Sequence, residues 1–177
     1  MVVNPFPLIW RADPFHLSLP SHDPDLLLPL KQAVPRFGLF SLSRQACVGR
    51  VTRDRLLLRH QRPFIHNDMA PVLDAAYLLN ESGPRLIGVY RMSWYSRWFM
   101  TIWFGFLMIL LPIFVIVGLI GLVTDGALSN LVFILSPLAM IAFGLALLQW
   151  GHRSWDEDKH VLESFVASRL GVPANAA

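Results

Sequence analysis

The chain has 177 residues, of which 54% are hydrophobic, and its 15 Lys and Arg outnumber its 12 Asp and Glu, giving a net charge of +3. This length fits one ordinary domain, or a smaller domain with a membrane anchor, and an apolar fraction above that of typical soluble domains favours the second. The single cysteine, Cys47, excludes an intrachain disulfide.

Residues 1–96 have the pattern of a small, mainly antiparallel β-rich domain. Apolar and polar residues alternate over 15–19, as in a strand with one buried face, and residues 25–33 have helical spacing. Turn signals separate four further predicted strands, at 47–51, 55–60, 72–79 and 85–92. A four-stranded meander leaves one apolar face open, and we expect the helix around residues 26–30 to cover it.

Arginines are concentrated between residues 44 and 62, where Asp54 is the only acidic residue. Those predicted to contact anionic lipid or a partner protein are Arg50, Arg53, Arg55, Arg59 and Arg62. A domain on the cytoplasmic side of a membrane is expected to be basic whatever it binds, so the same residues also fit a purely topological role. No exposed aromatic residues are interleaved with them, and nucleic acid is not an expected partner.

His60, His66 and Asp68 form the densest group of potential metal ligands in the sequence. A structural zinc site needs about four ligands at close spacing, and the neighbouring Pro63 and Pro71 explain the stretch as a surface turn. We therefore predict no metal and no cofactor. A membrane-bound enzyme or metal-binding protein acting around these three residues is kept as the alternative function.

Two apolar segments predict a transmembrane helical hairpin over residues 97–150. Residues 101–123 and 131–150 lack ionisable groups, and at about 1.5 Å per residue each can cross a hydrocarbon core of roughly 30 Å. The helices are expected at about 98–123 and 131–150. Basic residues flank the outer ends and are absent from the connecting loop, which predicts that both termini are cytoplasmic.

Small residues in both helices allow close backbone approach. Those expected to support helix packing are Gly118, Gly121, Ala139, Ala142 and Ala146. The short loop favours packing within the hairpin. A contact between copies of the chain, which would make a homo-oligomer, is the alternative.

Residues 151–177 are predicted to form a cytoplasmic amphipathic helix, ending at Gly171, and a tail. Ser154 and Glu157 have the spacing of a capping box, and the acidic residues 156–158 lie where the positive end of a helix favours them. The apolar stripe of this helix consists of Trp155, Leu162, Val166 and Leu170. Its target is either the membrane surface or the N-terminal domain.

Several short motifs precede the predicted hairpin: Val48-Gly49-Arg50-Val51, Leu56-Leu57-Leu58, and Asn67 with Pro71 four residues on. Together with a strand hairpin that enters a two-helix anchor, they resemble uncharacterised bacterial two-span membrane proteins. Ala75 and Ala76 stand where a glycine is more typical of those proteins. The resemblance covers residues 47–150 and implies the architecture and no activity. We expect an α+β protein of the bacterial inner membrane that serves as a non-enzymatic accessory or interaction module.

Overall fold

The computed structural model describes residues 5–20, 25–35, 46–62, 68–80, 83–125 and 128–172, which form an α+β structure. The chain divides into two compact units. The first, here called the sheet domain, comprises Trp10–Ser93 and Gly151–Ala177. The second, here called the helix unit, comprises Met1–Ile9 and Trp94–Trp150.

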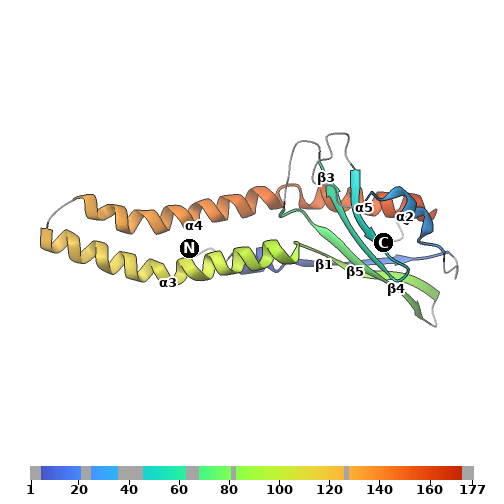
Figure 1. Cartoon of the computed structure of the whole chain (residues 1–177), viewed down its shortest axis with the longest axis horizontal. Coiled ribbons are helices and arrows are strands. Elements are labelled where there is room, and N and C mark those ends of the chain that lie inside the picture. Colours follow the sequence, from blue (N-terminus) through green and yellow to red (C-terminus); the bar gives the residue numbers. More distant parts are fainter. Residues whose placement is uncertain are drawn as a thin grey trace. The chain divides into compact units, whose positions relative to one another are not determined.

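A five-stranded antiparallel sheet forms the centre of the sheet domain (Figure 1). Its strands are β1 (Ala12–Ser18), β2 (Ala46–Val51), β3 (Arg55–Gln61), β4 (Val72–Asn80) and β5 (Gly83–Arg91). Their order is β1-β5-β4-β3-β2, so the four later strands follow one another as a meander. The alternating segment near residue 15 is a strand, as predicted, and it pairs with β5 at the far edge. The α+β class with an antiparallel sheet is thereby confirmed.

The inward face of the sheet is covered by two helices, α2 (Leu28–Ala33) and α5 (Trp155–Leu170). Helix α2 is shorter than predicted, because residues 25–27 form a turn. Helix α5 ends at Gly171, as predicted, in a left-handed conformation that glycine adopts without strain. Its apolar stripe joins the core of the sheet domain, where Trp155, Leu162 and Val166 expose no surface. Of the two targets that the sequence left open for this stripe, the structure shows the N-terminal domain.

The helix unit contains two long apolar helices, α3 (Trp94–Asp125) and α4 (Leu131–His152), which lie side by side (Figure 1). A short helix, α1 (Phe6–Ile9), packs on α3, and a 3-10 turn, η1 (Leu128–Asn130), precedes α4. Both long helices have the length and apolar character needed to span a membrane. Only 11% and 17% of the residues in their most apolar stretches are buried, far less than in the core helix of a soluble protein.

Helix packing in this unit uses glycines more than the predicted alanines. A Cβ at Gly118 would lie 2.6 Å from Ile134 Cγ1 of α4, and one at Gly121 would lie 2.7 Å from Asn130 Cγ of η1, so both glycines lie at close contacts within the hairpin. In α4 the corresponding small residue is Gly144, which is buried against Phe104. The three predicted alanines, Ala139, Ala142 and Ala146, are exposed. Ala142 and Ala146 each lie two positions from Gly144, about 200° around the helix, and the alanine stripe therefore faces away from α3.

Candidate functional site

His60 and Asp158 interrupt two apolar surfaces that face each other in the sheet domain. On β3 the inward positions are Leu56, Leu58 and then His60, and on α5 Asp158 falls between the buried Trp155 and Leu162. The side chains of His60 and Asp158 are each only 2% exposed. Buried polar groups are costly unless they are hydrogen-bonded, so this pair is the most informative feature of the core.

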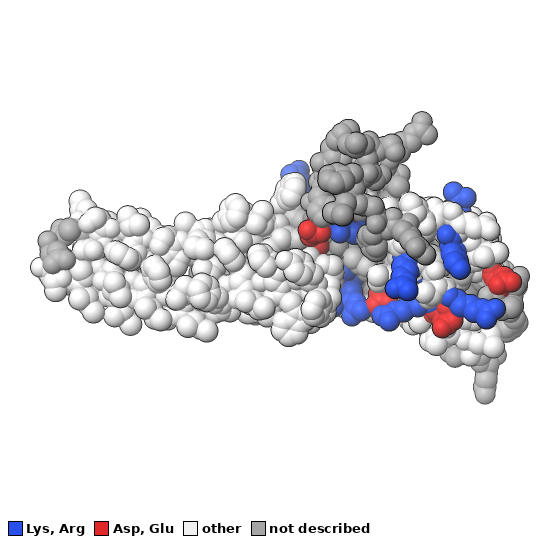
Figure 2. Space-filling model, in the orientation of Figure 1, with Lys and Arg blue, Asp and Glu red and all other residues white. Residues whose placement is uncertain are grey.

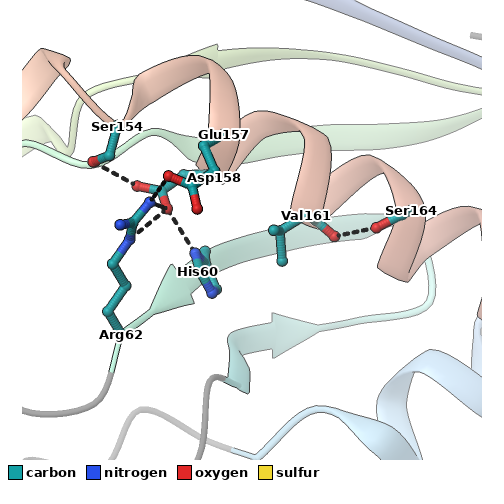
Figure 3. Close-up of polar contacts among 7 residues, drawn as sticks. All are labelled: His60, Arg62, Ser154, Glu157, Asp158, Val161 and Ser164. Atoms are coloured by element: carbon teal, nitrogen blue, oxygen red, sulfur yellow. Dashed lines mark hydrogen bonds and ion pairs between the residues drawn. The ribbon is translucent and has the colours of Figure 1, made fainter.

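A hydrogen-bonded network surrounds Asp158 (Figure 3). His60 Nδ1 lies 2.7 Å from Asp158 Oδ1, and Arg62 donates to the same oxygen from Nε at 3.1 Å and from Nη2 at 3.0 Å. Arg62 Nη2 also donates to Glu157 Oε2 at 2.7 Å, while Ser154 Oγ donates to Asp158 Oδ2 at 3.3 Å. Strand β3 and the residue after it thus join the first turn of α5 through one carboxylate.

The ionisation state of Asp158 decides whether Nδ1 of His60 acts as a donor. Burial raises the pKa of Asp158, but hydrogen bonds from His60 and Arg62 outweigh burial and hold that pKa below its ordinary value. Asp158 is therefore a carboxylate at neutral pH and can only accept hydrogen bonds. His60 must donate from Nδ1, and its Nε2 has no hydrogen-bond partner among the described residues.

His60 forms part of the wall of a pocket of about 590 Å³ in the sheet domain. The described residues that line it are Ala33, Pro35, Cys47, His60, Val161, Ser164, Phe165 and Ser168. Cys47 on β2 is directly opposite His60 on β3 in the sheet register, so both side chains belong to the same face. The pocket therefore joins the His60–Asp158 pair to an otherwise mainly apolar surface.

The hydroxyl and thiol groups of this pocket are poorly suited to nucleophilic catalysis. Burial raises the pKa of Cys47 to about 11, so on the order of one molecule in 10⁴ carries the reactive thiolate at pH 7. Ser164 donates its hydroxyl hydrogen to the Val161 carbonyl (Figure 3), and Ser168 donates to the Phe165 carbonyl. What this arrangement offers is a fixed imidazole in an apolar pocket, which suits binding.

The predicted group of His60, His66 and Asp68 is not assembled in the described part of the chain. Asp68 accepts a hydrogen bond from Arg59 at 3.2 Å, whereas the partner of His60 is Asp158, 98 residues later. His66 lies outside the described residues. The described residues contain no group of three or more His, Cys, Asp or Glu that could hold a metal ion.

The capping box predicted for Ser154 and Glu157 does not form. Ser154 occupies the position before α5, but its side chain makes no capping hydrogen bond and instead reaches Asp158. Glu157 binds Arg62 rather than the start of the helix. The sequence explained Asp158 only by a favourable interaction of its charge with the positive end of the helix. The one signal that could have distinguished it is its place between the apolar residues Trp155 and Leu162 at helical spacing.

The five predicted contact arginines fall into two groups. Arg55 binds Asp74 through two hydrogen bonds of 2.9 Å, Arg59 binds Asp68, and Arg62 belongs to the Asp158 network. Arg91 also donates to Asp74. The hydrogen bond from Arg55 is the main reason why the pKa of Asp74 lies below its ordinary value.

Arg50 and Arg53 form the second group. Both are exposed, and their side chains make no ion pair with a described residue. Figure 2 shows basic and acidic side chains interspersed over the sheet domain, whereas most of the length of the two long helices in view is white.

Comparison of the chain with protein-family models, curated proteins and solved structures finds no match.

Proposed function

We propose that the chain is a two-span protein of the bacterial inner membrane, and that its sheet domain is a non-enzymatic interaction module on the cytoplasmic side. The main support for a membrane anchor is the exposure of large apolar side chains on α3 and α4. Ile102 is 65% exposed, Ile109 67% and Val123 85%. Water would oppose this exposure by roughly 25 cal/mol per Å² of apolar surface, whereas lipid removes the penalty.

Charge and aromatic residues support the orientation. Arg97 stands near the start of α3, Arg153 and Lys159 follow α4, and no basic residue occurs in the segment 124–130 that connects the helices. Cationic flanks remain on the cytoplasmic side. Trp94 and Tyr95 at the start of α3 are each 69% exposed, as expected for side chains at a membrane–water interface.

The module is proposed to contact anionic lipid headgroups through Arg50 and Arg53. These two arginines have no acidic partner among the described residues, and the chain passes from β5 to α3 through only Met92 and Ser93. So short a connection gives the domain little reach away from the bilayer. A protein partner or a second copy of the chain is the alternative contact if lipid is excluded.

A membrane-bound enzyme is the second candidate, and the hydrogen bond between His60 and Asp158 is the observation in its favour, since a carboxylate that orients an imidazole is common in general-base catalysis. It ranks below a binding role because the neighbouring Cys47 is held as a thiol and the two pocket serines donate to backbone carbonyls. A metal-binding version would show stoichiometric metal in the purified protein.

Topology is tested with reporter fusions at each end of the chain and in the 124–130 connection. We expect cytoplasmic signals from both ends and a periplasmic signal from the connection. A control variant with two lysines introduced into the connection should have a weaker preference for this orientation. A periplasmic signal from either end of the unmodified chain would contradict the proposal.

Headgroup contact is tested with the full-length protein in detergent, by adding short-chain phosphatidylglycerol or phosphatidylcholine and recording thermal stability. We expect stabilisation by the anionic lipid alone, weakened by high salt and by the double variant Arg50→Gln, Arg53→Gln, at about 1 kcal/mol per arginine. Arg55→Gln is the matched control, because Asp74 already binds that guanidinium. Equal effects of the two lipids would favour a protein partner.

A further inference from the structure

His60 Nε2 is one of the buried side-chain atoms in the described part of the sheet domain that have no hydrogen-bond partner, as are Arg85 Nε and Tyr90 Oη. It is buried and accepts no hydrogen bond from a described residue, although its ring is firmly held from the other side by Asp158. In folded proteins nearly all buried polar side-chain atoms are hydrogen-bonded, and those that are not often have a functional reason. The unpartnered nitrogen belongs to a residue in the wall of the 590 Å³ pocket.

The chemistry of the pocket restricts what can bind. None of the described residues that line it carries a full charge of the Asp, Glu, Lys or Arg type, and Val161, Phe165 and Ala33 make much of the wall apolar. A charged ligand would lose part of its hydration here and find no opposite charge among the described residues of the wall, which is costly. The volume is within the usual range for small-molecule pockets.

The network around Asp158 determines which nitrogen of His60 is left for a ligand. Nδ1 donates to the carboxylate, and in the tautomer that carries its hydrogen on Nδ1 the other nitrogen, Nε2, presents a lone pair. Arg62 and Ser154 hold the carboxylate in turn, so the imidazole is oriented before any ligand arrives. Such preorganisation lowers the entropic cost of binding.

We infer that this pocket binds an uncharged, mostly apolar alcohol or phenol, whose hydroxyl group donates a hydrogen bond to His60 Nε2. The apolar body of the ligand packs against Val161 and Phe165 of α5. The site is separate from the arginines proposed to contact headgroups. It needs no covalent step and no activated thiol.

The test compares 4-ethylphenol with 4-ethylanisole, which has a similar shape but no hydroxyl hydrogen. Binding to the full-length protein in lipid nanodiscs is measured by ligand-observed NMR, and empty nanodiscs give the lipid background. We expect the phenol to bind about fivefold more tightly, the effect of one hydrogen bond. In His60→Leu, which keeps an apolar wall, the preference should disappear while both compounds still bind.

A second variant, Ser164→Trp, keeps the inference testable if His60→Leu fails to fold. Ser164 is exposed on α5 at the pocket, so an indole there should obstruct the pocket without disturbing the core. Both compounds should then lose at least tenfold in affinity. The inference is overturned if neither compound binds saturably, if the phenol has no advantage over the anisole, if that advantage survives His60→Leu, or if Ser164→Trp leaves binding unchanged.

Discussion

Leucine and isoleucine occupy opposite environments in the two units. In the sheet domain Leu56, Leu58 and Leu73 expose no surface, whereas in the helix unit Ile109 is 67% exposed and Leu119 is 52% exposed. A sheet in water must hide its apolar face, and α5 and α2 do this. Helices surrounded by lipid, as we propose for α3 and α4, have no such need, because hydrocarbon solvates their side chains.

The units also differ in what makes their internal contacts specific. The sheet domain buries a carboxylate, an imidazole and part of a guanidinium between β3 and α5. The described helix contacts instead rely on glycines, which let backbone and side chains of the neighbouring helix approach closely. Loss of charge should therefore damage one unit, and added volume should damage the other.

The largest effect is expected from Asp158→Ala. The change leaves His60 buried without its Nδ1 partner and deprives Arg62 of a buried carboxylate, which should cost about 3 kcal/mol of unfolding free energy. Denaturant unfolding in detergent, followed by tryptophan fluorescence, measures it. Asp156→Ala is the control, because that side chain is 81% exposed, and its effect should stay within about 0.5 kcal/mol. Equal effects would mean that the buried network contributes no special stability.

A smaller effect is expected from Gly118→Ala in the helix unit. The new methyl group would lie 2.6 Å from Ile134 Cγ1 and 3.1 Å from the Asn130 carbonyl oxygen, and this overpacking should cost about 1 to 2 kcal/mol. Gly105→Ala is the matched control, since nothing lies within 4 Å of its added Cβ and alanine favours the helix. Thermal stability in detergent should fall for the first variant only. An unchanged Gly118→Ala would show that the helices are not in close contact there.

The smallest effect is the acid sensitivity of the sheet domain. The pKa of Asp158 in the folded protein is below its ordinary value of 3.8, so its contribution to stability is complete above about pH 4 and is lost as pH falls through the folded pKa. Asp13 and Asp74 shift in the same direction. Unfolding free energies measured from pH 6 to pH 3 should fall less steeply in Asp158→Asn than in the wild type. Parallel curves would contradict this role of Asp158.

Local patterns predicted much of the fold. Alternation gave the strands, turn residues gave the two hairpins, and the uncharged runs gave the two long helices close to their observed ends. Helix ends and strand alternation depend on neighbours a few residues away, which a sequence shows directly. The same reasoning named Ala139, Ala142 and Ala146, which are exposed, and missed the buried Gly144, because small residues repeat on more than one side of α4.

The sequence by itself determined most of the elements, though not the short α1 and η1, and it determined the apolar character of α3 and α4 and the uneven distribution of charge. Only the tertiary structure decided that α5 covers the sheet, that β1 pairs with β5, and that Asp158 reaches His60 across 98 residues. The physical reason is that hydrogen bonds and ion pairs act over a few ångströms in space. Two residues distant in sequence reveal no pairing until the chain brings them together.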